Sequence, residues 1–393
     1  MRAVTRPLEV DVDLNDVAGH DGVLFVRDGV GLAGRGVAAM APVSEIRELL
    51  AAIEVDDTVQ VPGTGPVAFG AKPFTPGSPW TLTIPAVTVG KGPDGQRWVT
   101  RIDHAPDDLS PPPPPQPIVS SFRIRPGVAG DTYRAAVLAA RDAVRNGSIG
   151  KAVIARDVFV ESEHPLDVHA TLLRLRSSFG SSYRYSIHGL IGASPELLVQ
   201  RSGDVIRSHP LAGTAPRVGD PTVDERLAAE LLASTKNQVE HRIVIDMVHD
   251  TLLPWCSYLD WEPEPSIVKV ANVQHLGTMV EGRLSPPAAH VLDLVDALAP
   301  TPALGGHPRD RALDLIASVE GMDRGVYGGA VGWLDAHGNG TWAVTIRCAL
   351  LSDDRRVARL FAGGGIVAES DPAAELAETQ AKMQAMLSAI IRA

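Results

Sequence analysis

The sequence is poor in cysteine and in positive charge, and it has no long apolar run. Cys256 and Cys348 are the two cysteines among 393 residues and lack the CxxC spacing of a redox or metal pair, so we expect no disulfide framework and a reducing, cytoplasmic location. The 36 Lys and Arg against 47 Asp and Glu give a formal net charge of −11, which argues against general nucleic-acid binding. No stretch of about 18 apolar residues and no apolar leader occurs, so we expect neither membrane spanning nor export.

Apolar residues make up 45% of the chain, which is enough to bury a large core. Residues 1–109 consist of short apolar runs separated by Gly and Pro, a pattern that predicts strands and turns. The run Pro111–Pro115 follows and favours extended polyproline II structure. We therefore expect a β-rich N-terminal part that ends in a loop or spacer.

Helical and strand periodicities alternate after the proline run. Apolar spacing predicts a helix over 131–145 with Asp131 as its cap. The Val-rich alternation of KAVIARDVFVE predicts a strand that starts at Lys151. Residues 222–253 predict one long amphipathic helix that Pro254 ends.

Capping signals and turn signals complete the prediction. Thr222 and Glu225 match a capping box at the start of the long helix. Residues 328–361 predict a β meander. The last helix is expected to start at Ser370, Asp371 and Pro372, a cap followed by the residue best suited to the first turn, and to run close to the C-terminus. Runs of strands between separate helices, without strict βαβ alternation, favour the α+β class.

Several nucleotide-binding and hydrolase motifs are missing, because the chain has no complete phosphate loop, GxGxxG fingerprint, HExxH or GxSxG elbow. Glu240 and Glu378, on separate predicted helices, can bind a hard cation such as Mg²⁺. Glu378 shares a helical stripe with Glu375 and Lys382, and that pattern alone favours a solvent-exposed charged face.

Four further features have a structural interpretation beside a functional one. Gly363–Gly365 can form a concavity for an anion or a tight turn. Position alone favours a surface amine for Lys151 and a core histidine for His275. The turn at Pro210–Thr214 carries little weight by itself.

The joint order of these features resembles that of the chorismate-utilising enzymes and, within them, the isochorismate synthases. The resemblance covers roughly residues 132–387 and extends weakly to FGAKPF near Val67. It rests on KAVIARDV, GASPELLV, SHPLAGTAPR, STKNQVEHRIV, VQHLGT, APTPALGG, VYGGAVGWLDAHGNGTWAVTIRCA, RLFAGGGIV and AETQAKM, all in family order.

The resemblance implies one large α+β domain, built from two similar halves with stacked antiparallel sheets and flanking helices. The β-rich part, 1–119, then belongs to the same domain as the chorismate-binding catalytic region, 120–393. The family is also the source of the expectation that the chain is a monomer.

Carried over residue by residue, the resemblance implies two catalytic groups. These are Lys151, the base that activates water, and Glu196, the acid that protonates the departing hydroxyl. It implies Mg²⁺ as the cofactor, held by Glu240 and Glu378, and the small molecule chorismate as the partner. The substrate-binding residues that it implies are Gly213, Thr214, His275, Arg347, Gly363 and Lys382.

The implied chemistry explains why these residue types are needed. Moving the hydroxyl of chorismate from C4 to C2 requires water to attack one ring carbon while hydroxide leaves another. Water is a poor nucleophile, so Lys151 must act as a neutral amine, and Glu196 must be protonated, which requires a raised pKa. Chorismate carries two carboxylates, which Mg²⁺, Arg347 and Lys382 would neutralise and orient. The expected enzyme is an isomerase that feeds siderophore, salicylate or menaquinone biosynthesis.

Single positions separate the sister activities. Ala212 stands where aminodeoxychorismate synthases carry lysine, and Lys151 stands where anthranilate synthases carry glutamine, so water is the expected nucleophile. Salicylate synthases share the lysine but lack the GNGTW and PTPA elements, which leaves additional pyruvate elimination as an alternative. A catalytically silent chorismate-binding relative is another. The chain departs from the synthases at Ala299, Thr235 and Thr341, which bears on substrate placement and rate.

Overall fold

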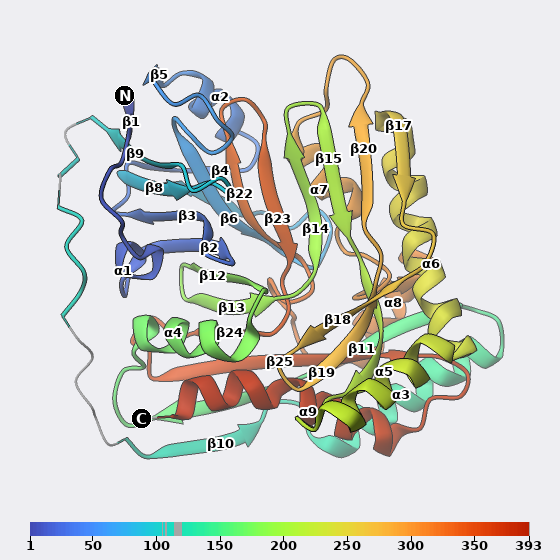
Figure 1. Ribbon diagram of the computed structural model, residues 1–393. Coiled ribbons are helices and arrows are strands. Elements are labelled where there is room, and N and C mark those ends of the chain that lie inside the picture. Colours follow the sequence, from blue (N-terminus) through green and yellow to red (C-terminus); the bar gives the residue numbers. More distant parts are fainter. Residues whose placement is uncertain (104, 107, 114–119, 393) are drawn as a thin grey trace.

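The computed structural model describes residues 1–103, 105–106, 108–113 and 120–392, whose strands form three sheets (Figure 1). The largest sheet has 13 strands and runs through β10 (Phe122–Pro126), β11 (Lys151–Ser162), β25 (Val357–Ile366), β24 (Cys348–Leu351), β13 (Leu190–Ser194), β12 (Tyr183–Ile187), β2 (Val23–Arg27), β3 (Val30–Arg35), β8 (Val87–Lys91), β9 (Arg97–Ile102), β1 (Arg2–Pro7) and β5 (Glu54–Asp57), with β21 (Gly306–His307) paired to β11.

The second sheet has nine strands, in the order β17 (Cys256–Trp261), β20 (Val280–Leu284), β15 (Val205–His209), β14 (Leu197–Ser202), β23 (Gly340–Val344), β22 (Ala330–Asp335), β6 (Val67–Lys72), β7 (Thr81–Ile84) and β4 (Ala39–Pro42). The third sheet consists of β16 (Leu211–Pro216), β19 (Val273–Gly277) and β18 (Ser266–Val270). The helices are α1 (Leu14–Ala18), α2 (Ile46–Ala51), α3 (Gly130–Arg145), α4 (Val168–Phe179), α5 (Pro221–Ala233), α6 (Thr235–Leu252), α7 (Val291–Leu298), α8 (Arg309–Val319) and α9 (Pro372–Ile391).

Both large sheets combine strands from the two ends of the chain. N-terminal β2 pairs with β12 in one sheet, and N-terminal β6 pairs with β22 in the other. The predicted α+β class with antiparallel sheets is confirmed, although β1 pairs with β5 in parallel. The end of the proline run, Pro114 and Pro115, lies outside the described residues. The boundary at residue 119 stays a prediction.

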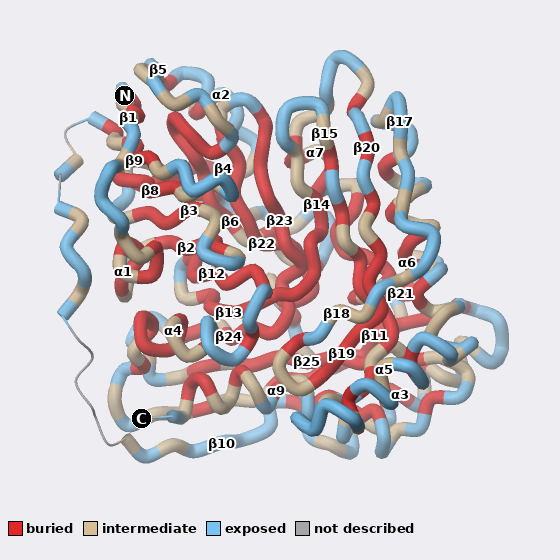
Figure 2. Tube along the Cα trace, in the orientation of Figure 1, coloured by how far each residue is buried: buried red, intermediate tan, exposed pale blue. Residues whose placement is uncertain are grey.

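The main hydrophobic core lies between the two large sheets, where Figure 2 shows strands that are buried along most of their length. Phe25 and Phe361 of the largest sheet share this core with Phe69 and Trp342 of the nine-stranded sheet. A second core packs α1, α4 and α9 on the other side of the largest sheet, and a third packs α3 and α8 against β11. None of the described helices is both long and apolar enough to cross a membrane.

Two of the points at which the chain crosses between the two large sheets are neighbours. Glu196 lies between β13 and β14, and Arg347 lies between β23 and β24. The backbone N–H of Val344 donates to the Glu196 carbonyl and that of Ala193 donates to the Arg347 carbonyl, each at 3.1 Å. The single meander predicted over 328–361 is therefore wrong. It is two hairpins in different sheets, and Arg347, with a φ of 51°, takes the left-handed conformation between them.

The long helix predicted over 222–253 is also wrong, because it breaks at Ser234 into α5 and α6. Ser234 is extended and its hydroxyl accepts from the N–H of Asn237, so it caps a new helix rather than continuing the old one. Asp220, not Thr222, caps α5, and α3 begins at Gly130 without a side-chain cap from Asp131. The predicted strand start at Lys151 is confirmed.

The last predicted helix is confirmed in outline. α9 begins at Pro372, and the carboxylate of Asp371 caps it by accepting from the N–H groups of Ala373 and Ala374.

A buried ion pair holds β11 against α8 and the chain that follows it. Glu320 accepts from the Ala155 N–H at 2.6 Å and pairs with Arg324, which also donates to the carbonyls of Val153 and Leu304. Both side chains are buried, so neither charge has water as an alternative partner. This pair fixes the strand that carries Lys151.

We expect Glu320→Gln to lower the free energy of unfolding by about 3–5 kcal/mol, because it leaves the Arg324 guanidinium buried without its counter-charge. The matched control is Glu230→Gln, which breaks the exposed Arg226–Glu230 pair at the same helical spacing and should cost less than about 1 kcal/mol. Urea unfolding of both variants measures the difference. Equal losses would contradict the role of the buried pair.

Candidate active site

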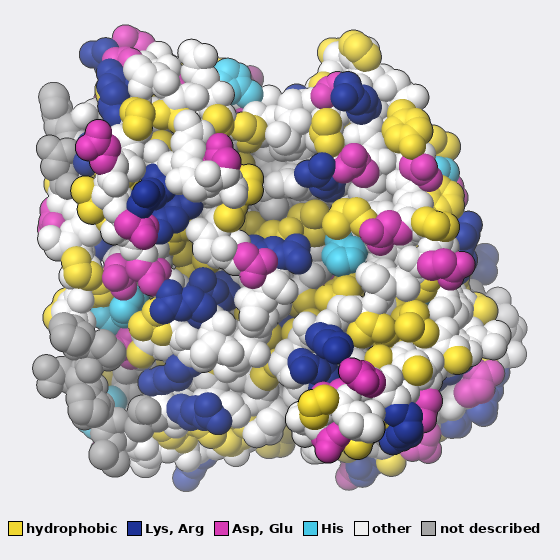
Figure 3. Space-filling model, in the orientation of Figure 1, with side chains coloured by type: hydrophobic (Ala, Val, Ile, Leu, Met, Phe, Trp, Pro, Cys, Tyr) yellow, Lys and Arg dark blue, Asp and Glu magenta, His cyan; other side chains and the backbone are white. Residues whose placement is uncertain are grey.

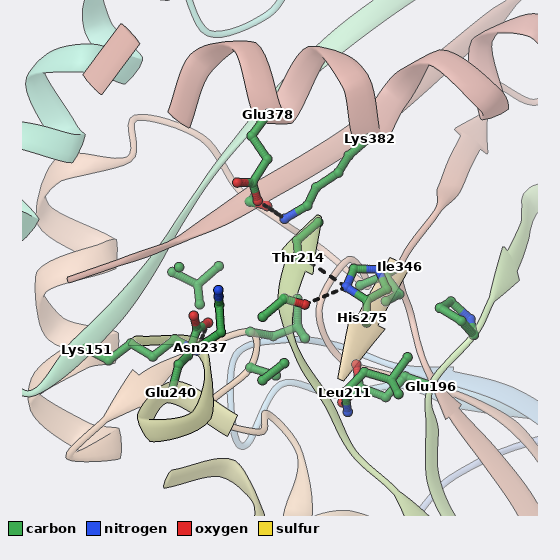
Figure 4. Close-up of a pocket in the computed structure, with 18 of the residues that line it drawn as sticks. Lys151, Glu196, Leu211, Thr214, Asn237, Glu240, His275, Ile346, Glu378 and Lys382 are labelled. Carbon is green, nitrogen blue, oxygen red and sulfur yellow. Dashed lines mark hydrogen bonds and ion pairs between the residues drawn. The ribbon is translucent and has the colours of Figure 1, made fainter. Parts of the chain in front are cut away.

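All ten residues predicted for the site line one pocket of about 220 Å³ (Figure 4). Strands β11 and β25 of the largest sheet form one wall, the three-stranded sheet forms another, and α6 and α9 complete it. The ten residues are Lys151, Glu196, Gly213, Thr214, Glu240, His275, Arg347, Gly363, Glu378 and Lys382. The pocket is also lined by Lys236, Asn237, Tyr327 and Glu375, which the site prediction omitted.

Lys151 lies at the start of β11 with an exposed fraction of 1%, so the surface-amine interpretation is wrong. Its Nζ donates to Glu240 Oε1 at 2.7 Å. Burial opposes ionisation of Glu240, but Lys151 and Lys382 outweigh it and hold the pKa of this carboxyl below its ordinary value. The pair joins the first residue of β11 to the second turn of α6.

The glycine run forms part of the pocket floor. Gly363–Gly365 lies inside β25 and pairs with β11, so the tight-turn interpretation is wrong. A Cβ added at Gly365 would stand 2.9 Å from Glu240 Oε1 and 3.0 Å from Lys151 Cε. A larger residue there would displace the ends of these two side chains and so disturb the ion pair.

Glu196 lies on the opposite side of the pocket from Lys151 in Figure 4. Its side chain is 3% exposed, and the N–H of Leu211 donates to Oε1 at a long 3.4 Å. Burial raises the pKa of Glu196 to about 8, while the hydrogen bond from Leu211 and the charges of Lys151 and Arg347 oppose the rise. The carboxyl therefore holds its proton at neutral pH, as a general acid must.

His275 positions Arg347 through a fixed tautomer. Its Nδ1–H donates to the Gly213 carbonyl at 2.9 Å, and its Nε2 accepts from Arg347 Nη2 at 3.2 Å. Burial, followed by the charges of Arg347 and Lys382, lowers the pKa of His275 to about 3, so the ring is neutral. His275 is thus both a hydrogen-bonded core histidine and part of the pocket wall.

The acidic stripe of α9 faces the pocket rather than solvent, which corrects the interpretation from helical spacing. Lys382 Nζ pairs with Glu378 Oε1 at 2.5 Å and donates to the Gly363 carbonyl at 2.9 Å. Burial and the charge of Glu378 raise the pKa of Glu375. The spacing of Glu375 from Glu378 was visible in the sequence, but only the packing of α9 on β25 shows that both point inward.

The carboxylates of the pocket fit a magnesium ion by their chemistry. Glu240, Glu375 and Glu378 supply the oxygen ligands that this ion prefers, and Glu240 and Glu378 each already hold a lysine as counter-charge. Among the described residues, no group of three or more His, Cys, Asp or Glu forms a preformed metal cage. Magnesium needs none, because it keeps several waters and takes one or two protein carboxylates.

Comparison with known proteins shows the family to which a chain with this fold and pocket belongs. The family described as chorismate binding enzymes matches residues 86–391. This chain belongs to the chorismate-binding enzyme family.

Several relatives in this family are named isochorismate synthases. One of them, provisionally named isochorismate synthase MenF, from Mycobacterium tuberculosis, is 42% identical over 341 residues, which cover 84% of this chain and 87% of the relative. Isochorismate synthase DhbC of Bacillus subtilis is 37% identical over 83% of this chain and 81% of its own. The solved structure of MenF, the menaquinone-specific isochorismate synthase from Escherichia coli, superimposes with a TM-score of 0.84 over 99% of this chain and 94% of that one, at 22% identity, a likeness of fold.

The raised pKa of Glu196 predicts a pH-dependent stability. Between pH 4.5 and about pH 8, Glu196 is protonated in the folded protein but ionised in the unfolded chain. The free energy of unfolding therefore falls as the pH rises through this window. Glu196→Gln removes this contribution to the pH dependence, because glutamine does not titrate. Since one pKa unit corresponds to about 1.4 kcal/mol, the stability of the wild type relative to Glu196→Gln should fall by a few kcal/mol between pH 5 and pH 8. Urea unfolding at several pH values measures this difference, and a constant difference would contradict the protonated carboxyl.

Proposed function

We propose that the protein is an isochorismate synthase, which converts chorismate to isochorismate by adding water at C2 of the ring and releasing the C4 hydroxyl. The observation that carries this proposal is the position of a buried amine, Lys151, and a buried, protonated carboxyl, Glu196, on opposite sides of one pocket. The names of the relatives support the same activity.

Lys151 forms an ion pair with Glu240, so in this mechanism its ammonium must first lose one proton to solvent. As a neutral amine it then takes a proton from water as the oxygen bonds to C2. Glu196 gives its proton to the C4 oxygen, which leaves as water while the ring double bonds shift. The reaction is reversible, so in the return direction the two groups exchange their roles. Apolar walls from Val153 and Leu304 keep bulk water away from the two groups.

The remaining residues hold the two substrate carboxylates. Arg347 is positioned by His275, and Lys382 by the Gly363 carbonyl. These two cations attract an anionic substrate to a protein whose net charge of −11 would otherwise repel it. Gly213 and Thr214 supply backbone and hydroxyl contacts beside them. Magnesium, held by Glu240 and Glu378, would neutralise and orient the substrate.

Incubating the purified protein with chorismate and MgCl₂, followed by chromatography, tests the proposal. We expect isochorismate as the product. Salicylate with pyruvate would instead indicate a salicylate synthase, anthranilate would require ammonia as nucleophile, and no conversion would indicate a silent relative.

We expect Lys151→Ala to reduce turnover of chorismate by about 100-fold or more, because a positioned base typically contributes that much. Lys72→Ala is the control: it removes another buried lysine, which pairs with Asp296 outside the pocket, and should retain turnover. Circular dichroism checks that both variants fold. Full activity of a folded Lys151→Ala variant would refute the assignment.

We expect Glu240→Gln and Glu378→Gln each to raise the magnesium concentration needed for half-maximal activity by about tenfold or more, because each removes a charged oxygen ligand. Glu230→Gln, on the exposed face of α5, should leave the titration unchanged. The measurement is initial rate against MgCl₂ concentration. An unaltered titration in both pocket variants would argue against a metal role.

A further inference from the structure

A second cavity lies away from the candidate active site, between α1, the start of β12 and the end of α4. Its volume is about 490 Å³, within the range of about 300–1,000 Å³ that is typical of small-molecule sites. It shares no lining residue with the first pocket. Figure 1 shows α1 and α4 together on the left of the molecule, and we call this space the α1–α4 cavity. It is lined by Asp11, Val12, Asp13, Leu14, Asn15, Val26, Asp28, Gly29, Lys91, Arg176, Gly180 and Arg184.

The α1–α4 cavity contains a buried arginine without a counter-charge. Arg184 is 3% exposed, and its Nη1 donates to Asn15 Oδ1 at 2.6 Å and to the Leu172 carbonyl at 3.4 Å. Its other two guanidinium nitrogens have no hydrogen-bond partner in the described part of the chain, and no described carboxylate lies within ion-pair distance. Burial, followed by the charge of Arg176, lowers the pKa of Arg184 to about 10. A buried charge is normally paired, so this guanidinium lacks an anion.

The other charges of the cavity already have partners. Asp11 pairs with Lys91 and Asp13 with Arg176, each at 2.6 Å, and Asp28 lies 3.6 Å from Arg27. The site therefore has room for one negative charge, and the three aspartates disfavour an anion that carries more.

The candidate active site offers an internal comparison. Arg347 is likewise buried, makes no ion pair with a described residue and lines a pocket in which an anionic substrate is proposed. Arg156 is also buried and forms no ion pair within the described ranges, but it lines neither cavity. The combination of an unpaired buried arginine with an open space is thus shared by Arg347 and Arg184.

We propose that the α1–α4 cavity is a second ligand site that binds a small organic monocarboxylate. Its carboxylate would occupy the free edge of the Arg184 guanidinium, whose planar fork suits two carboxylate oxygens. Its apolar part would lie against Val12, Leu14 and Val26. The site does not depend on the activity proposed for the first pocket.

Isothermal titration calorimetry of the full chain with benzoate tests this proposal. Benzamide, which has a similar shape but no charge, is the control ligand. We expect saturable benzoate binding, no benzamide binding, and a loss of affinity of about tenfold or more in Arg184→Gln. Arg156→Gln should bind benzoate as the wild type does, and Arg347→Gln should keep the binding that Arg184→Gln loses.

The proposal would be overturned if benzoate showed no saturable binding, or if Arg184→Gln bound it as tightly as the wild type does. It would also be overturned if only Arg347→Gln lost binding, because benzoate would then occupy the first pocket. Inorganic phosphate that bound as tightly as benzoate would overturn the monocarboxylate class. Should Arg184→Gln fail to fold, the nearly isosteric Asn15→Asp serves instead. It sets a carboxylate beside Arg184 Nη1 and should weaken benzoate binding by a similar factor, while unchanged binding would count against the site.

Discussion

The ion pair between buried Lys151 and partly buried Glu240 is the interaction on which the arrangement of the pocket depends. It joins the first residue of β11 to the second turn of α6, and the Lys151 charge could not be buried alone without a large cost. The pair lies so close to β25 that a side chain at position 365 would disturb it. One contact thus links three sequence features: Lys151 at the start of β11, Glu240 on α6 and the glycine run of β25.

Two neighbouring crossings between the large sheets, at Glu196 and Arg347, account for the opposite side of the pocket. Each crossing interrupts regular pairing for a few residues, and backbone hydrogen bonds hold the two interruptions together. Glu196 and Arg347 are placed there, where a side chain can leave both sheets and point toward the three-stranded sheet. The same backbone hydrogen bonds therefore hold the acid, Glu196, and the cation, Arg347, in fixed positions. Catalysis requires groups that are positioned in this way before the substrate binds.

Charge in this protein is distributed locally rather than globally. Figure 3 shows acidic and basic side chains interspersed on one face, without a broad area of either sign. The cations that would receive an anion lie instead inside cavities, Arg347 and Lys382 in one and Arg184 in the other. A buried guanidinium without a carboxylate partner is a costly feature, and a ligand that supplies the missing charge offsets that cost.

The sequence by itself determined the α+β class, the strand that starts at Lys151 and the cap of the last helix, because these follow from periodicity and capping signals. The set of residues that meet in one pocket followed from the resemblance of its motifs to those of the chorismate-utilising enzymes. Tertiary structure decided the rest. Local patterns could not show that Ser234 breaks the long helix, that the meander divides at Arg347 between two sheets, or that the stripe of Glu375 and Glu378 faces inward. Each of these depends on contacts between residues far apart in the chain, and the same amphipathic or alternating pattern is compatible with solvent until a partner surface covers it.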